Sequence, residues 1–178
     1  MRSTLLALLV LSFPAALVAQ AAPAPPPAAK AEDVSSIDAI MKAVYDVISG
    51  PAGQKRDWNR MRSLFIPGAR LIPTGRGPDG KHGARVWTLE EYISNAGPRL
   101  EESGFFEGEL GRVEERYGNV VHLMSAYDSR RTAADPQPFA RGVNSFQLMY
   151  DGSRWWVVTI FWQGETPDNP IPAKFLKK

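Results

Sequence analysis

The chain has 178 residues, which fits a single domain of about 100 to 200 residues and leaves little room for a second. It has no cysteine and only two histidines, which excludes disulfides, thiolate nucleophiles, iron–sulfur clusters and zinc sites built on cysteine or on three imidazoles. Its 21 basic and 19 acidic residues give a formal charge of only +2, so no concentrated basic face for nucleic acid is indicated. We expect no metal site, no cofactor and no nucleic-acid partner.

The first 33 residues have the pattern of an export signal followed by a spacer. An apolar run broken by Pro14 leads to residues 19–21 (Ala-Gln-Ala), which have the small-residue spacing of a signal-peptidase site. We therefore predict a signal peptide over residues 1–21, whose removal leaves a periplasmic or secreted protein without a stable membrane anchor. Residues 22–33, rich in alanine and proline, are expected to form an extended tether, and residues 34–178 the single domain.

Two helices and a short strand are expected at the start of this domain. Apolar residues recur at helical spacing over 37–48, directly after two serines, which predicts an amphipathic helix there. Asp57 is placed to cap a second, shorter helix that begins at Trp58 and is stopped by Pro67. A short strand over 69–73 follows.

A third helix is indicated by a capping box. Thr88 and Glu91 stand at the spacing in which a threonine caps the helix start and a glutamate three residues later reaches back to it. Trp87 is placed to pack on Tyr92 as a hydrophobic staple, which strengthens the prediction. Pro98 is expected to kink or divide this helix.

After the third helix the apolar period changes to two, which is typical of strands. Strands that follow helices indicate an α+β fold, with the helices packed on one face of an antiparallel sheet. Turn residues separate four expected strands, over residues 106–117, 120–129, 139–150 and 154–163.

Two patterns could bind anions. Residues 75–80 match the G-x-G-x-x-G spacing of dinucleotide-binding loops, but Pro78 and the glycines that follow do not allow the required helix, so we expect a hairpin loop. Arg130, Arg131 and Arg141 flank the polar turn between two strands. They are either a solvated strand end or a clamp for a carboxylate ligand.

Three residues are candidates for proton transfer, and each has a simpler structural explanation. Asp57 caps a helix, unless an apolar cavity raises its pKa. His82 lies in the expected glycine-rich loop. His122 lies in a strand, where it is either part of the core or pocket wall, or a general acid or base.

Aromatic residues make both faces of the last hairpin apolar. With a three-residue loop at 151–153, Phe146 shares one face with Trp156 and Trp162, whereas Phe161 lies on the other. We expect the first face to be buried under the helices. The second is too apolar for free solvent, so we predict a homodimer through this outer sheet face.

Several segments also carry a resemblance to a known family. They are the amphipathic opening helix, residues 56–71 (from Arg-Asp-Trp to Phe-Ile-Pro-Gly-Ala-Arg-Leu), and the closing segments 139–148 and 151–156. On these segments the chain resembles the nuclear-transport-factor-2-like superfamily, in its exported, SnoaL-like bacterial branch, over about residues 34–165. The resemblance implies a cone-shaped, cystatin-like fold with a strongly curved antiparallel sheet around a long helix, an apolar pocket inside, and a dimer across the outer face.

The same resemblance implies a range of functions, since relatives include ketosteroid isomerase, polyketide cyclases, and members that only bind or scaffold. We expect an exported protein that binds a small apolar or amphipathic molecule. Two alternatives stay open: a cofactor-independent isomerase, cyclase or hydratase that uses a pocket carboxylate or histidine, and a dimeric interaction scaffold. The predicted pocket residues are Trp58, Trp87, Tyr92, His122, Asn144, Phe146, Trp156 and Trp162.

Overall fold

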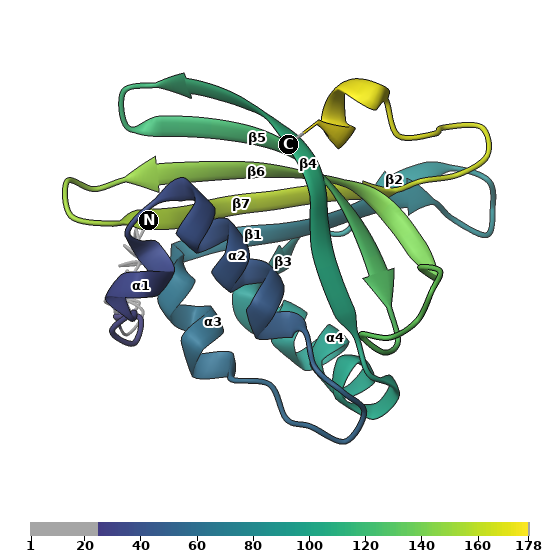
Figure 1. Cartoon of the computed structure of the whole chain (residues 1–178), viewed down its shortest axis with the longest axis horizontal. Coiled ribbons are helices and arrows are strands. Elements are labelled where there is room, and N and C mark those ends of the chain that lie inside the picture. The colour runs from purple at the N-terminus through teal and green to yellow at the C-terminus, as the bar shows by residue number, and fades with distance from the viewer. Residues whose placement is uncertain (1–24, 178) are drawn as a thin grey trace, which may run out of the picture.

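The structure, a computed structural model, describes residues 25–177 of the chain. Helices lie against one face of a curved seven-stranded sheet, and a short C-terminal segment lies against the other face (Figure 1). This arrangement confirms the predicted α+β class. The predicted signal peptide and the first residues of the predicted tether fall outside the described residues. Within the described part of the chain, no helix is both long and apolar enough to cross a membrane.

The folded domain begins earlier than predicted. Residues 25–30 have no regular secondary structure, but a one-turn helix, α1 (Ala31–Val34), already belongs to the domain. Its Asp33 is buried and accepts two hydrogen bonds from the guanidinium of Arg60, at 2.8 and 2.7 Å, and Val34 joins the core. The boundary of the predicted tether at residue 33 is therefore wrong, because a buried ion pair between distant segments leaves no mark in local composition.

Two of the predicted helices begin at the expected residues with the expected caps. Helix α2 (Ile37–Ile48) begins after Ser36, whose hydroxyl accepts a hydrogen bond from the backbone N–H of Ala39 at 3.0 Å. Helix α3 (Trp58–Leu64) begins after Asp57, whose carboxylate accepts from the backbone N–H of Arg60 at 2.8 Å. Both side chains satisfy helix donors that would otherwise have no partner.

The third predicted helix, α4 (Leu89–Ser103), has both hydrogen bonds of the capping box. The Thr88 hydroxyl accepts from the N–H of Glu91 at 3.2 Å, and the Glu91 carboxylate accepts from the N–H of Thr88 at 2.7 Å. Trp87 and Tyr92 pack with their ring centroids 6.4 Å apart. Helix α4 runs through Pro98 without interruption, so the expected division at this residue does not occur.

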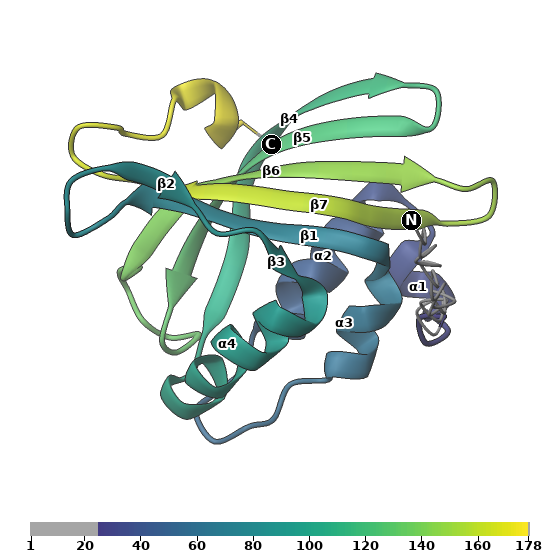
Figure 2. The ribbon, with the colours of Figure 1, turned by 180° about the vertical axis from the view of Figure 1, so that it is seen from behind.

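Four strands form an antiparallel meander with bounds within one residue of those predicted. They are β4 (Phe106–Tyr117), β5 (Val120–Arg130), β6 (Ala140–Tyr150) and β7 (Trp155–Gly164). Together they curl around α2 (Figures 1 and 2).

The remaining strands complete the sheet in the order β2-β1-β7-β6-β5-β4. Strand β1 (Phe65–Arg76) is longer than the predicted strand over 69–73, and β2 (His82–Ala84) and β3 (Trp87–Thr88) both pair with it. Strand β1 runs parallel to β7, which corrects the prediction of a fully antiparallel sheet. The two strands lie far apart in the chain, so no hairpin imposes an antiparallel direction.

The hairpin of β6 and β7 corrects the predicted side-chain faces. Tyr150 pairs with Trp155, so the loop has four residues instead of three, and Trp155 faces the core. A register shift after Gln147 restores the predicted parity further along, where Asn144 pairs with Trp162. Trp156 therefore lies on the outer face, because a one-residue change of register moves a side chain across the sheet.

The C-terminal segment covers part of the outer face with the 3₁₀ helix η1 (Ala173–Leu176). Phe175 of η1 is buried, and a Cβ atom on Gly111 of β4 would come within 2.6 Å of the backbone at Leu176. Phe161 on the same outer face stays 43% exposed. Part of the surface that the sequence assigns to a partner subunit is thus covered by the chain itself.

Candidate functional site

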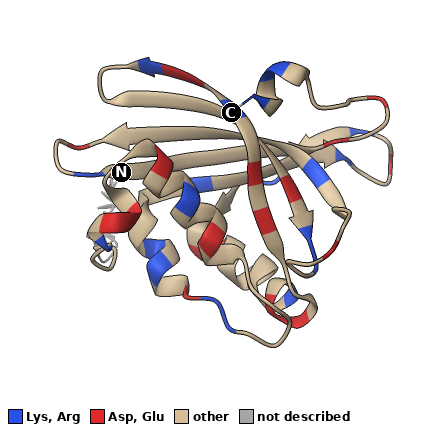
Figure 3. Cartoon of the chain, viewed as in Figure 1, with Lys and Arg blue, Asp and Glu red and all other residues tan. Residues whose placement is uncertain are grey.

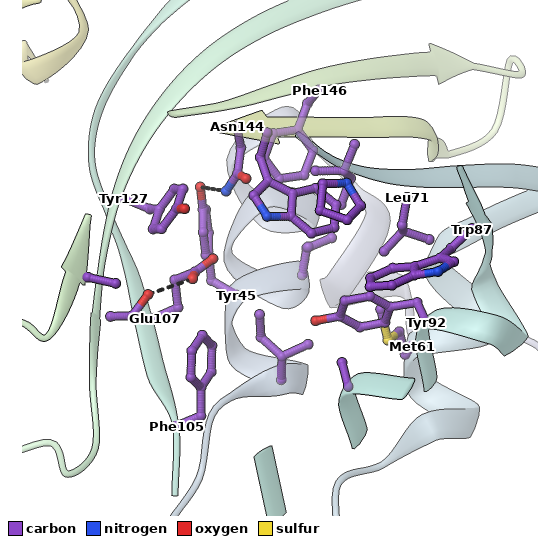
Figure 4. A pocket seen from close by; sticks show the side chains of 18 of the residues that line it. Tyr45, Met61, Leu71, Trp87, Tyr92, Phe105, Glu107, Tyr127, Asn144 and Phe146 are labelled. Atoms are coloured by element: carbon purple, nitrogen blue, oxygen red, sulfur yellow. Dashed lines mark hydrogen bonds between the residues drawn. The ribbon is translucent and has the colours of Figure 1, made fainter. Parts of the chain in front are cut away.

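A cavity of about 350 Å³ lies between α2, α4 and the inner face of the sheet (Figure 4). Its volume falls within the range of small-molecule sites. Most of its wall is apolar, with aromatic rings contributed by several elements. The main apolar side chains are Leu71, Trp87, Phe105, Phe146, Ile160 and Trp162.

Five of the eight predicted pocket residues line this cavity. They come from α4 and its preceding strand on one side, and from β6 and β7 on the other. Tyr92 packs edge-on against Trp162, with ring centroids 6.4 Å apart, which joins the two sides. The five are Trp87, Tyr92, Asn144, Phe146 and Trp162.

The other three predicted pocket residues lie elsewhere. Trp58 sits between α3 and α4, where its indole N–H donates to Glu101 at 3.1 Å. His122 is on the outer face of β5, with Nε2 3.0 Å from the hydroxyl of Ser145. Trp156 is also on the outer face and donates to Asp151 at 2.6 Å. Alternation along a strand identifies two faces but does not say which is inner, which explains the error for His122.

None of the three predicted proton-transfer candidates lines the cavity. Asp57 is exposed and caps α3, which agrees with its simpler explanation. His82 is exposed on the β1–β2 hairpin, where it pairs with Arg76. Together with His122 on the outer face, these residues do not converge on one site.

The cavity instead contains a carboxylic acid that the sequence reasoning missed, Glu107 of β4 (Figure 4). One of its carboxyl oxygens accepts a hydrogen bond from the hydroxyl of Ser129 at 2.8 Å. Burial raises the pKa of Glu107 from its ordinary value of 4.5 to about 7, and the charge of Asp128 acts in the same direction. Glu107 is therefore near half-protonation at neutral pH.

Phenol and amide groups surround this acid. The hydroxyl of Tyr45 accepts from the side-chain amide of Asn144 at 3.1 Å and lies 2.7 Å from the hydroxyl of Ser125, which donates to Glu109 at 2.6 Å. Burial, and then the charge of Glu107, raise the pKa of Tyr45 and Tyr92 above the ordinary phenol value. Both phenols stay protonated. Because the proton of Ser125 is donated to Glu109, the proton of Tyr45 is donated to Ser125, and Tyr92 is the phenol that can donate a hydrogen bond to a ligand.

Neither of the two patterns that could bind anions forms an anion site by itself. Arg130 pairs with Asp128 at 2.6 Å and Arg141 with Glu165 at 3.1 Å, so neither guanidinium is free for a carboxylate ligand. Of these three arginines, Arg131 alone has no carboxylate within 4.0 Å among the residues that the structure describes. Residues 75–80 form the predicted hairpin turn, which leads into β2 and opens no helix. In residues 25–177, no group of three or more acidic or histidine side chains is arranged to hold a metal ion.

The geometry defines a small α+β domain whose curved sheet encloses an apolar cavity with one titratable acid. No protein-family model and no curated protein matches the sequence. Solved structures do match it in fold. A protein of unknown function with a cystatin-like fold from Nostoc punctiforme is 12% identical with a TM-score of 0.53, over 74% of this chain and 90% of the other.

Two further solved structures agree. A nuclear-transport-factor-2-like protein of unknown function from Silicibacter pomeroyi is 11% identical with a TM-score of 0.50, over 74% of this chain and 94% of the other. A putative calcium/calmodulin-dependent protein kinase II association domain from Xanthomonas campestris is 12% identical with a TM-score of 0.52, over 74% and 86%. The chain has the nuclear-transport-factor-2-like fold, which confirms the resemblance at the level of fold. The exported, SnoaL-like branch stays a prediction.

Proposed function

We propose that this chain is an exported protein that binds a small apolar or amphipathic molecule in the cavity between α2, α4 and the sheet. The observation that carries the proposal is a cavity of about 350 Å³ with aromatic walls and few polar groups. Binding sites for small molecules typically combine an apolar wall with a few polar groups that fix orientation. Glu107, Tyr92 and Asn144 are the groups in place for that role.

Native mass spectrometry of the purified chain tests this proposal, together with thermal shifts across fatty acids, steroids and polyketides. A ligand present at a hundred times its Kd should stabilise the fold by about 2.7 kcal/mol, or about 5 to 10 °C in Tm. Ala96 of α4 lines the cavity, so Ala96→Phe should fill it and abolish the shift. Ser94→Phe, on an exposed position of the same helix, is the matched control. Absence of both a bound mass and a shift would refute the proposal.

Glu107 favours a second candidate function, a cofactor-independent isomerase, cyclase or hydratase. A carboxyl group whose pKa lies near 7 can accept and return a proton at neutral pH. The phenol of Tyr92, which lines the same cavity, can donate to an oxygen on which negative charge develops. Glu107 and Tyr92 therefore supply a base and a hydrogen-bond donor within one cavity.

Proton exchange distinguishes this enzyme from a passive binder. A bound ketone with an acidic α-hydrogen should exchange that hydrogen for deuterium in heavy water, and Glu107→Gln should stop the exchange while binding persists. The exchange rate should rise with pH through about 7, where the carboxylate form appears. Equal exchange in wild type and Glu107→Gln would exclude Glu107 as the base.

A further inference from the structure

A second recess adjoins the cavity at the end of α4. The two share four lining residues, so the recess borders the cavity, and we refer to it as the mouth of the cavity. Phe105 and Phe139 stand at this junction with ring centroids 6.1 Å apart, and Phe139 is 48% exposed. The shared residues are Ala96, Arg99, Phe105 and Phe139.

Two arginines line this mouth from different elements. Arg99 comes from α4 and contacts both the cavity and the recess, and Arg131 follows directly after β5. Within residues 25–177, no carboxylate lies within 4.0 Å of either guanidinium. Glu102 lines the same recess but forms no ion pair with either arginine. The two positive charges are thus available to a ligand.

The guanidinium of Arg131 is held in place. Its Cζ atom lies 4.0 Å from the ring centroid of Phe139, and one of its N–H groups donates to the hydroxyl of Ser103 at 2.9 Å. The carboxylate of Asp135 is bound by the backbone N–H groups of Arg131 and Thr132, and leaves the guanidinium free. A planar guanidinium fixed on an aromatic ring keeps the remaining donors directed outward, as anion recognition requires.

We propose that the ligand of the cavity is an amphipathic anion, whose apolar body fills the cavity and whose carboxylate, sulfonate or sulfate group meets Arg99 and Arg131 at the mouth. This inference rests on the proposed binding function and specifies the ligand class. Charges of both signs are interspersed over the rest of the chain (Figure 3), so the pair of arginines matters through its position at the mouth and not through net charge.

Two fluorescent probes with the same aromatic body distinguish apolar binding in the cavity from anion recognition at its mouth. Anilinonaphthalene sulfonate carries the anion, whereas N-phenylnaphthylamine lacks it. We expect both to bind the full-length chain. Arg99→Gln with Arg131→Gln should weaken binding of the sulfonate about tenfold and leave the neutral probe unchanged. Raised salt should weaken only the sulfonate.

The control is Arg116→Gln, which removes an arginine at the far end of β4 that lines neither the cavity nor its mouth. It should leave both probes unaffected. If the sulfonate binds equally to wild type and to the double variant while the neutral probe also binds, the inference about the mouth is wrong and the binding function stands. If neither probe binds wild type, both are wrong.

Discussion

Glu107 should make the stability of the fold depend on pH in a way that one substitution removes. Its folded-state pKa of about 7 lies above the ordinary 4.5, so between these two values the folded state binds a proton that the unfolded state releases. Stability contributed by the neutral carboxyl is therefore fully present below about pH 4.5 and is lost as the pH rises through about 7. Each pH unit between 4.5 and about 7 lowers the free energy of unfolding by about 1.4 kcal/mol, which adds up to about 3 kcal/mol over this range.

The measurement is urea unfolding of wild type and of Glu107→Gln at a series of pH values. Glutamine keeps an oxygen that can accept from Ser129 and stays neutral at every pH. We expect the variant to match wild type near pH 4.5 and to exceed it by up to about 3 kcal/mol above about pH 7, with some of this lost to solvent screening because Glu107 is only half-buried. A stability difference that does not change with pH would refute the argument.

Three further substitutions test other parts of the structure. Thr88→Ala removes one side of the capping box and should lower the free energy of unfolding by about 1 kcal/mol, as measured in urea. Arg56 is buried and donates to the backbone carbonyls of Ile48, Gly50 and Leu100. Arg56→Ala should therefore lower the free energy of unfolding by about 3 kcal/mol or more. A loss as small as that of Thr88→Ala would contradict this role. For the predicted homodimer, Phe161→Asp should convert a dimer to a monomer in sedimentation, whereas a monomeric wild type would count against any dimer through the outer face.

Local signals predicted the helices well because the interactions that set their ends are local. Ser36, Asp57 and Thr88 each bond to a backbone N–H three residues further on. The capping side chain and the backbone N–H that it binds therefore lie within four consecutive residues of the sequence. The period-two strands were predicted for the same reason, and their bounds agree within one residue.

The pairing of strands is different, because it depends on loop length and on irregularities that the apolar pattern does not record. The four-residue loop and the register shift after Gln147 place Trp155 inside and Trp156 outside, and only partner strands define these faces. The parallel pairing of β1 with β7 likewise joins segments about a hundred residues apart.

Glu107 was missed because its chemistry is made by distant residues. In the sequence it is one of several glutamates in a strand with mixed polarity. Ser129, which donates to its carboxyl group, and Ser49, whose hydroxyl accepts from its backbone N–H at 3.0 Å, come from other elements. The sequence analysis instead selected Asp57, His82 and His122 by residue type, and these three residues do not form a common site. A raised pKa belongs to an environment, which only the folded chain supplies.

Ligand binding and the protonation of Glu107 should be coupled, since both occur in the same cavity. A neutral apolar molecule displaces water from around the carboxyl group, which disfavours its charged form and raises its pKa further. Binding then takes up a proton, so affinity must fall as the pH rises above about 7. N-phenylnaphthylamine carries no acidic group of its own, so its Kd should increase with pH for wild type and stay flat for Glu107→Gln. The same pH profile in both proteins would mean that the probe does not desolvate Glu107, and would place it outside the cavity.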